Sequence, residues 1–185
     1  GVRFLHKTIP GDPDWKGMEF AVAVVEKGDL KVVAIVTSVE SSDVVGAAVK
    51  AAKAALQEDP SKLIANHEKT WKTFWSRSGL EIDDKLLQRT WYRGLYFLRC
   101  VSKPGVQCPG LFASLINNTP AWHGDYHLNY NIQQVFWAAY AANQLDLVEP
   151  YDRLIREYLP RGRWLAKEVY NMGGSRHSHC SMLEA

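Results

Sequence analysis

The pattern of apolar residues changes near residue 40, and this change limits the chain to folds in which strands precede helices. Two runs rich in Val and Ile, residues 20–26 (FAVAVVE) and 31–38 (KVVAIVTS), are separated by a short link that contains Gly28. This pattern predicts a β-hairpin. Because an isolated hairpin is only marginally stable in water, we expect it to belong to a larger sheet whose other strands lie upstream.

After residue 40 the apolar residues recur at helical spacing, and no further strand pair is indicated. The predicted helices cover residues 41–57, 61–78, 83–100, 132–144, 147–160 and 161–174. Ser41, Ser42 or Asp43 can cap the first of these helices, and Asp83 or Asp84 can cap the third. The sequence therefore predicts a mainly α fold class.

The order of elements also predicts how the chain is divided. Residues 1–40 end a β-domain, residues 41–80 form a helical linker, and residues 81–185 begin an all-α domain. The loop over residues 102–121 contains three Pro and two Gly, and long loops within compact domains are often functional. Because the predicted hairpin and the last predicted helix look incomplete, we expect the chain to be an internal piece of a longer protein.

Charge and hydropathy exclude two classes of partner. The formal net charge is +2 and acidic and basic residues are interspersed, so no general attraction to nucleic acid is expected. No apolar segment approaches the roughly 20 residues that a membrane helix needs. We therefore predict neither a nucleic-acid nor a membrane partner, and no signal peptide is visible.

The three cysteines, Cys100, Cys108 and Cys180, do not show a metal-binding spacing. Free, partly buried thiols are the favoured interpretation, because free Cys is among the most buried residue types. The alternative is a Cys100–Cys108 disulfide, which would require an oxidising compartment.

Two groups of histidines are candidate metal ligands. His123 and His127 are four residues apart, but the surrounding Pro and Gly argue against the helix that this pair would need. His177 and His179 lie beside Cys180 without a fourth ligand nearby. We therefore predict no metal and no other cofactor.

Residues 126–133 (YHLNYNIQ) alternate between apolar and polar side chains, which predicts an extended segment. The expected apolar face carries Tyr126, Leu128, Tyr130 and Ile132, and the expected polar face carries His127, Asn129, Asn131 and Gln133. The alternative is an ordinary strand with a solvated face, but such faces usually carry Lys, Glu and Thr. Amide groups that donate and accept at once, set among aromatic rings, are typical of a ligand pocket.

Residues 123–137 (HGDYHLNYNIQQVFW) resemble the motif of glycoside hydrolase family 95, the inverting 1,2-α-L-fucosidases and their L-galactosidase relatives. The residues that match this motif are His127, Asn129, Asn131, Gln133, Phe136 and Trp137. The resemblance extends over residues 20–171. It implies the end of a β-sandwich in residues 1–40, a linker in residues 41–80, and the first helices of an (α/α)6 toroid in residues 81–185.

The resemblance also implies a reaction and a substrate. An inverting glycosidase combines a general acid with an activated water. Asn129 and Asn131 would be catalytic by orienting that water toward a terminal α-L-fucosyl or α-L-galactosyl residue of an oligosaccharide. The substrate-binding residues so implied are His127, Trp122, Gln133 and Asp125. Secretion, or another extracytoplasmic location, is likewise an expectation from the family.

The chain departs from the family pattern at two places. It has SLINN where members have NLQG, and GGSRHSHCSM where members have a segment like HHNTD. The general-acid Glu and the partner Asp are expected after Ala185, so residues 1–185 alone are expected to be inactive and poorly stable. The alternatives are a non-catalytic carbohydrate-binding toroid module and another (α/α)6 glycosidase or phosphorylase.

Overall fold

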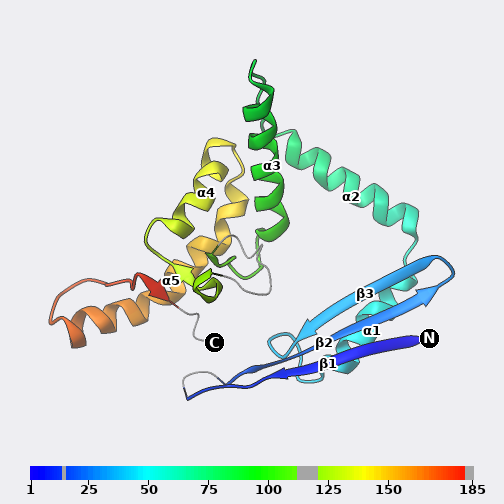
Figure 1. Cartoon of the computed structure of the whole chain (residues 1–185), viewed down its shortest axis with the longest axis horizontal. Coiled ribbons are helices and arrows are strands. Elements are labelled where there is room, and N and C mark those ends of the chain that lie inside the picture. Colours follow the sequence, from blue (N-terminus) through cyan, green and yellow to red (C-terminus); the bar gives the residue numbers. More distant parts are fainter. Residues whose placement is uncertain (14–15, 112–120, 182–185) are drawn as a thin grey trace. The chain divides into compact units, whose positions relative to one another are not determined.

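The computed structural model describes residues 1–13, 16–111 and 121–181, and the chain divides into two compact units (Figure 1). The first unit comprises residues 1–70 and the second residues 71–183. An antiparallel sheet lies in the first unit, and helices make up most of the second. The predicted mainly α class, with strands before helices, is confirmed at this level.

The sheet of the first unit has three antiparallel strands in the order β1 (Val2–Ile9), β2 (Met18–Lys27) and β3 (Leu30–Thr37). The predicted hairpin is β2–β3, with Phe20 opposite Thr37. The third strand, β1, was not predicted. Its sequence, VRFLHKTI, carries polar and apolar residues on both faces, and every residue in it is exposed. Pairing with β2, rather than its own pattern, makes this segment a strand.

One face of the sheet is covered by α1 (Val44–Leu56) (Figure 1). The contact is made by small side chains: Ala21 and Ala23 of β2 and Ala48 and Ala52 of α1 are all fully buried. Small residues at these facing positions allow the helix axis to come close to the strands.

Of the three candidate caps for α1, Asp43 takes the role. Its Oδ1 accepts a hydrogen bond of 2.8 Å from the backbone N–H of Gly46. A Cβ atom at Gly46 would lie 2.0 Å from Asp43 Oδ2, so the cap also explains why a glycine follows it. The helix therefore begins three residues later than the predicted start at Ser41.

The second unit is built mainly from helices (Figure 1). Its helical elements are the end of α2 (Pro60–Trp75), α3 (Lys85–Val101), η2 (Ala121–Gly124), α4 (Asn131–Ala141), η3 (Leu145–Val148), α5 (Glu149–Trp164) and η4 (Leu165–Val169). Two short antiparallel strands, β4 (Tyr126–His127) and β5 (Cys180–Ser181), pair with each other. Asp84 caps α3 by accepting from the N–H groups of Leu86 and Leu87.

The core of this unit joins the end of α2 to α3, α4 and η3. Its most buried large side chains include Phe74, Leu95, Ile132, Phe136 and Leu147. The core thus fixes α4, the helix that follows the polar segment, through its buried face.

The buried side-chain amide of Gln144 connects the chain after α4 to the end of α2. The side chain of Gln144 is fully buried, and its Nε2 donates to the carbonyl oxygen of Phe74 at 2.8 Å. Its Oε1 accepts from Arg77 Nη1 at 3.1 Å, and Arg77 also forms an ion pair of 2.5 Å with Asp146. Because these bonds satisfy both ends of the amide, its burial does not leave an unpaired polar group.

The last two predicted helices, residues 147–160 and 161–174, are wrong as separate elements. The helix α5 continues through Pro160 to Trp164 and then widens into the π-helical turn η4. Pro removes one backbone donor and usually ends a helix. Here the backbone of Arg176 donates to the carbonyl of Gly162 at 2.9 Å, so the returning chain packs on the helix just after the proline.

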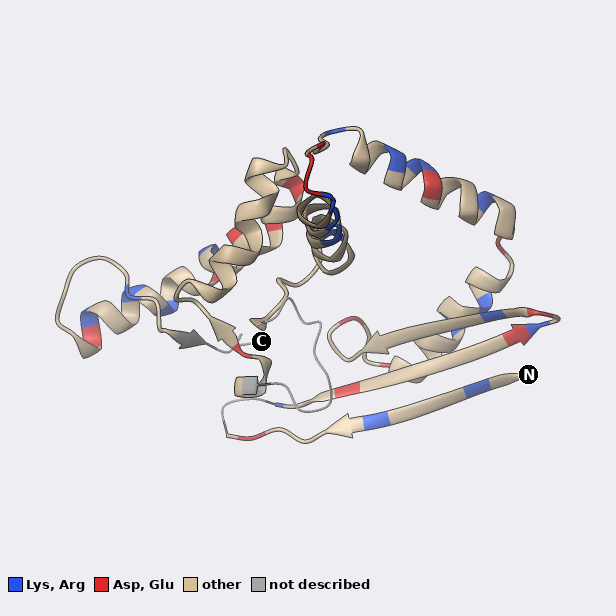
Figure 2. Ribbon diagram, turned by 45° about the horizontal axis from the view of Figure 1, so that its top comes forward, with Lys and Arg blue, Asp and Glu red and all other residues tan. Residues whose placement is uncertain are grey.

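Charged residues of both signs are interspersed along α2 and α5, as Figure 2 shows. Two ion pairs on α5 link Arg153 to Glu149 and Glu157 at 3.4 and 3.7 Å. Within the described residues, no helix combines the length and the hydropathy that crossing a membrane requires.

The interface between α1 and the sheet generates a stability prediction. Ala52→Leu should lower the free energy of unfolding by about 1–3 kcal/mol, because the added atoms meet β2 and β3 at a fully buried position. Ala51→Leu is the matched control, since Ala51 is exposed on the same helix. Chemical denaturation followed by circular dichroism measures both, and equal effects of the two substitutions would contradict the tight packing.

Candidate active site

The polar segment that the sequence singles out contains three conformations instead of one. Tyr126 and His127 form the short strand β4, the chain then turns, and α4 begins at Asn131. The predicted extended segment over residues 126–133 is therefore wrong after His127. The reversal occurs at Tyr130, whose φ of 72° and ψ of −49° are incompatible with a strand.

The expected separation into an apolar and a polar face is lost with the strand. His127 is buried, at 9% exposure, although it was expected on the polar face. Tyr130 is 54% exposed, although it was expected to pack inward. Ile132 is buried at 1% because it now lies on the core face of α4. Asn129 and Asn131 are both exposed, one on each side of the turn.

The turn is closed by its own backbone. The N–H of Asn131 donates to the carbonyl oxygen of Asn129 at 2.9 Å, across the single residue Tyr130. A hydrogen bond between residues i+2 and i, with a positive φ at the central residue, defines the rarer and more strained form of γ-turn. Gln133 supports it from α4, because its Nε2 donates to the carbonyl oxygen of Leu128 at 2.6 Å.

His127 is held by an acidic neighbour. Its Nδ1 forms a short ion pair or hydrogen bond with Asp125 Oδ1. The side chains of both residues are mostly buried, at 11% and 19% exposure for His127 and Asp125. The ring of His179 lies 5.3 Å from that of His127, and the Trp122 ring lies 5.5 Å away. These contacts fix the plane of the imidazole and direct Nδ1 toward the carboxylate.

Neighbouring segments hold this arrangement in place. The N–H of Leu128 donates to the carbonyl oxygen of His179 at 2.8 Å, which extends the β4–β5 pairing. The N–H of Leu111 donates to the carbonyl oxygen of Asp125 at 2.9 Å. At Gly110 a Cβ atom would lie 2.6 Å from the carbonyl oxygen of Gly124, so only glycine allows these two segments to approach.

Two neutral side chains, those of Tyr126 and Cys108, lie next to the site. The Tyr126 hydroxyl donates to the carbonyl oxygen of Cys108 at 2.7 Å. Burial raises the pKa of Tyr126 to about 12, and burial also raises the pKa of the Cys108 thiol to about 12, despite a lowering effect of the Arg153 guanidinium. Both groups therefore stay protonated near neutral pH, and neither adds a charge near His127.

In the structure Cys100 and Cys108 are not bonded to each other, and the described residues form no metal-binding cluster. Cys100 is exposed and Cys108 is buried, and both are free thiols, so the Cys100–Cys108 disulfide does not form here. Over the described parts of the chain, no group of three or more His, Cys, Asp or Glu side chains could hold a metal ion. The side chains of His123 and Cys180 lie outside the described residues.

The structure thus brings Trp122, Asp125 and His127 together, and it places the amides of Asn129 and Asn131 on the adjoining turn. Sequence reasoning missed two features: the direct pairing of Asp125 with His127 and the contact of His179. The first has a local signal, because residues two apart in extended backbone point to the same side. The second depends on a segment about 50 residues away in the chain.

Comparisons with known proteins agree on one family. Residues 44–183 match the model of the glycosyl hydrolase family 95 catalytic domain, which is more than half of the chain. A probable alpha-fucosidase A of Aspergillus niger is 32% identical over 91 residues, which cover 48% of this chain and 12% of the relative. The matched part therefore represents only a small share of that relative's length.

The raised pKa of Cys108 leads to a test of whether this thiol is buried and protonated in the folded protein. At pH 8 iodoacetamide should alkylate Cys108 at least about 10-fold more slowly than the exposed Cys100, because the thiolate is the reactive form. Since the pKa is raised, the thiolate fraction of Cys108 grows only as the pH rises toward 12. Peptide mass spectrometry of the folded protein measures both rates. The denatured protein is the control, and equal rates before denaturation would contradict the buried, neutral thiol.

Proposed function

The chain belongs to glycosyl hydrolase family 95, and we propose that its protein hydrolyses terminal α-L-fucosyl or α-L-galactosyl residues of glycans with inversion of configuration. The observation that carries this proposal is the family match over residues 44–183, which includes the whole candidate active site. The name of the Aspergillus niger relative, a probable alpha-fucosidase, favours fucose as the sugar.

The proposed chemistry rests on the two amides of the turn. Asn129 and Asn131 are exposed, and within the described residues their side chains have no hydrogen-bond partner. Each amide can accept a hydrogen bond from a water through its oxygen and donate a hydrogen bond through its nitrogen. We assign these two residues to the orientation of the attacking water on one face of the sugar ring.

A neutral amide is a poor base, so the two asparagines need carboxylates to complete the reaction. In inverting enzymes one carboxylic acid protonates the leaving oxygen while a carboxylate activates the water. Asp125 is unsuited to either role because its carboxylate is directed at His127. We assign both carboxylates to residues outside the described part of the chain.

The residues next to the amides have the character of a sugar site. The Trp122 side chain is 63% exposed, and an aromatic face of this kind packs against the C–H face of a sugar. His127 would contact the substituent at C5 of the sugar through the ring edge opposite Nδ1. Asp125 would act through His127 by fixing its orientation.

The proposal includes the larger architecture and the location. Residues 1–40 would end a β-sandwich, residues 41–80 would form the linker, and residues 81–185 would start an (α/α)6 toroid. The exposed apolar side chains of α3, among them Leu86 at 70% and Leu87 at 59%, are consistent with further helices packing there. A secreted or extracytoplasmic protein would meet such glycans.

The proposal predicts the effect of removing either amide. In the full-length protein as its gene encodes it, Asn129→Ala and Asn131→Ala should each lower kcat for an α-1,2-fucosylated oligosaccharide by about 100-fold or more. KM should change little, because the water rather than the sugar loses its contacts. Released fucose is the measured product.

Asn66→Ala is the matched control, because Asn66 is an exposed asparagine on α2, outside the site. It should leave kcat unchanged. Saturable binding of the oligosaccharide by the wild-type protein, without release of fucose, would replace the glycosidase by a carbohydrate-binding module. Unchanged kcat in both site variants would contradict the assignment of the amides.

A further inference from the structure

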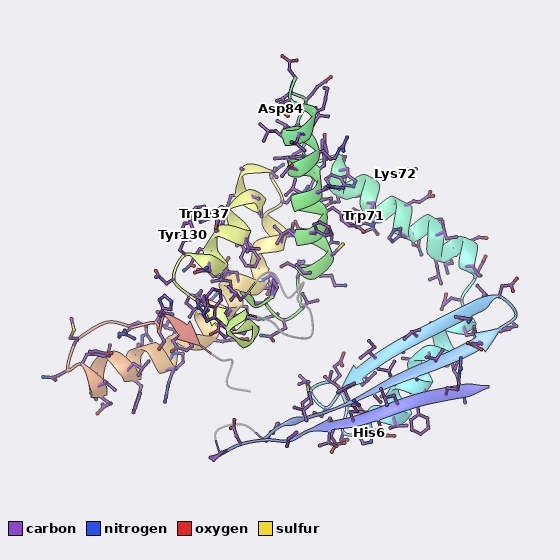
Figure 3. The ribbon with its side chains drawn as sticks, viewed as in Figure 1. His6, Trp71, Lys72, Asp84, Tyr130 and Trp137 are labelled. Atoms are coloured by element: carbon purple, nitrogen blue, oxygen red, sulfur yellow. The ribbon has the colours of Figure 1, made fainter. Side chains whose placement is uncertain are left out.

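The backbone at Tyr130 adopts a conformation that a tyrosine rarely takes. Its φ of 72° and ψ of −49° lie in the region of the strained γ-turn. Residues with a side chain avoid positive φ, and those that adopt it are held there by their surroundings and cluster at functional sites. Tyr130 stands between the two amides of the proposed water site, and Figure 3 shows it on the same side of α4 as Trp137.

The surroundings that hold the turn can be named. On one side, the N–H of Leu128 is bonded to His179, and its carbonyl oxygen accepts from Gln133 Nε2 at 2.6 Å. On the other side, the N–H of Gln134 donates to the carbonyl oxygen of Tyr130 at 2.9 Å and starts α4. Gln133 is therefore the side chain that connects the helix to the chain before the turn.

The turn changes how the two amides are presented. In an extended strand, Asn129 and Asn131 would be separated by roughly 6.6 Å along one face. The hydrogen bond of 2.9 Å from Asn131 N–H to the carbonyl of Asn129 draws their backbones together instead. Two amides on one tight turn can converge on a single small molecule such as a water.

The Gln133 side chain is poorly placed to hold a sugar hydroxyl. Its Nε2 is engaged by Leu128, its Oε1 is buried from solvent, and the Tyr151 hydroxyl lies close enough to the amide for their interaction to lower the pKa of Tyr151 against the larger raising effect of burial. The neighbouring Gln134 is exposed and has no such role. The two adjacent glutamines thus differ in contacts although they share a residue type and a helix turn.

We propose that Gln133 is a positioning residue: by holding the Leu128 carbonyl it maintains the γ-turn at Tyr130, and the turn sets Asn129 and Asn131 for water. This inference rests on the proposed function and replaces the sequence-based assignment of Gln133 to substrate binding. It separates two effects that kinetics can measure, because a positioning residue acts on kcat and a sugar ligand acts on KM.

The first test compares matched substitutions at the two glutamines in the full-length protein. Gln133→Glu removes the donor to Leu128, while a carboxylate in the first turn of α4 remains favourable for the helix. We expect kcat for fucose release to fall at least about 10-fold, with KM within about threefold of wild type. Gln134→Glu makes the same change in charge and should leave both constants near wild type.

Circular dichroism confirms that the compared variants are folded at the assay temperature. A rise in KM with unchanged kcat in Gln133→Glu would overturn the proposal in favour of sugar binding. Unchanged constants in that variant would overturn it as well, since a purely structural contact would alter only the melting temperature.

A second pair of variants tests the backbone at Tyr130. Tyr130→Asn and Tyr130→Val both remove the aromatic ring, but Asn tolerates positive φ and a β-branched Val does not. We expect the Val variant to have a kcat at least about 10-fold below that of the Asn variant. Equal kcat in the two variants would show that the ring matters rather than the turn.

The crystal structure of Gln133→Glu separates this inference from the proposed function. If the wild-type protein releases no fucose, the glycosidase proposal fails, and the structure alone then decides whether Gln133 holds the turn. A Tyr130 φ that leaves the positive region, with displaced Asn129 and Asn131 side chains, supports the role of Gln133. An unchanged turn overturns it.

Discussion

The backbone reversal at Tyr130 is the constraint on which the candidate site depends. It ends the strand that contains His127, begins α4, and places an exposed amide on each side of one residue. A strained conformation persists only where the surroundings over-determine it. Here the core face of α4, anchored by the buried Ile132, and the bond from Gln133 to the Leu128 carbonyl supply that support.

The support for the turn reaches into the core of the second unit. The helix α4 packs through Phe136, and the chain just after the helix is fixed by the buried amide of Gln144. Gln144 in turn holds the carbonyl of Phe74 at the end of α2. A rigid helix behind a strained turn is a sound base for a site, because side chains on well-packed elements keep their positions within small limits.

Electrostatics divide the site into a charged and a neutral part. The carboxylate of Asp125 is committed to His127, whereas the buried Cys108 and Tyr126 below remain protonated, since burial raises the pKa of each to about 12. The amides of Asn129 and Asn131 are neutral at every pH. In the proposed hydrolysis, the described part of the site would contribute orientation and binding, and the acid chemistry would come from groups outside it.

Sequence patterns predicted those elements whose cause is local. Alternating Val and Ile residues predicted the hairpin β2–β3, and Asp43 and Asp84 were among the predicted caps because capping involves only the next three residues. Elements stabilised from a distance were missed: β1 is a strand because β2 pairs with it, and α5 continues through Pro160.

The candidate site likewise combines features that the local sequence determines with features that distant contacts determine. By itself the sequence determined the residue types, the family, and the spacing of Asn129 and Asn131, because these are properties of the order of residues. Only the tertiary structure decided that Tyr130 turns rather than extends. Period-two alternation favours a strand in isolation, but burial of Ile132 within the helical core and the hold of Gln133 on the preceding carbonyl stabilise the turn instead. The burial of Ile132 arises only when the helices assemble, so no local pattern contains it.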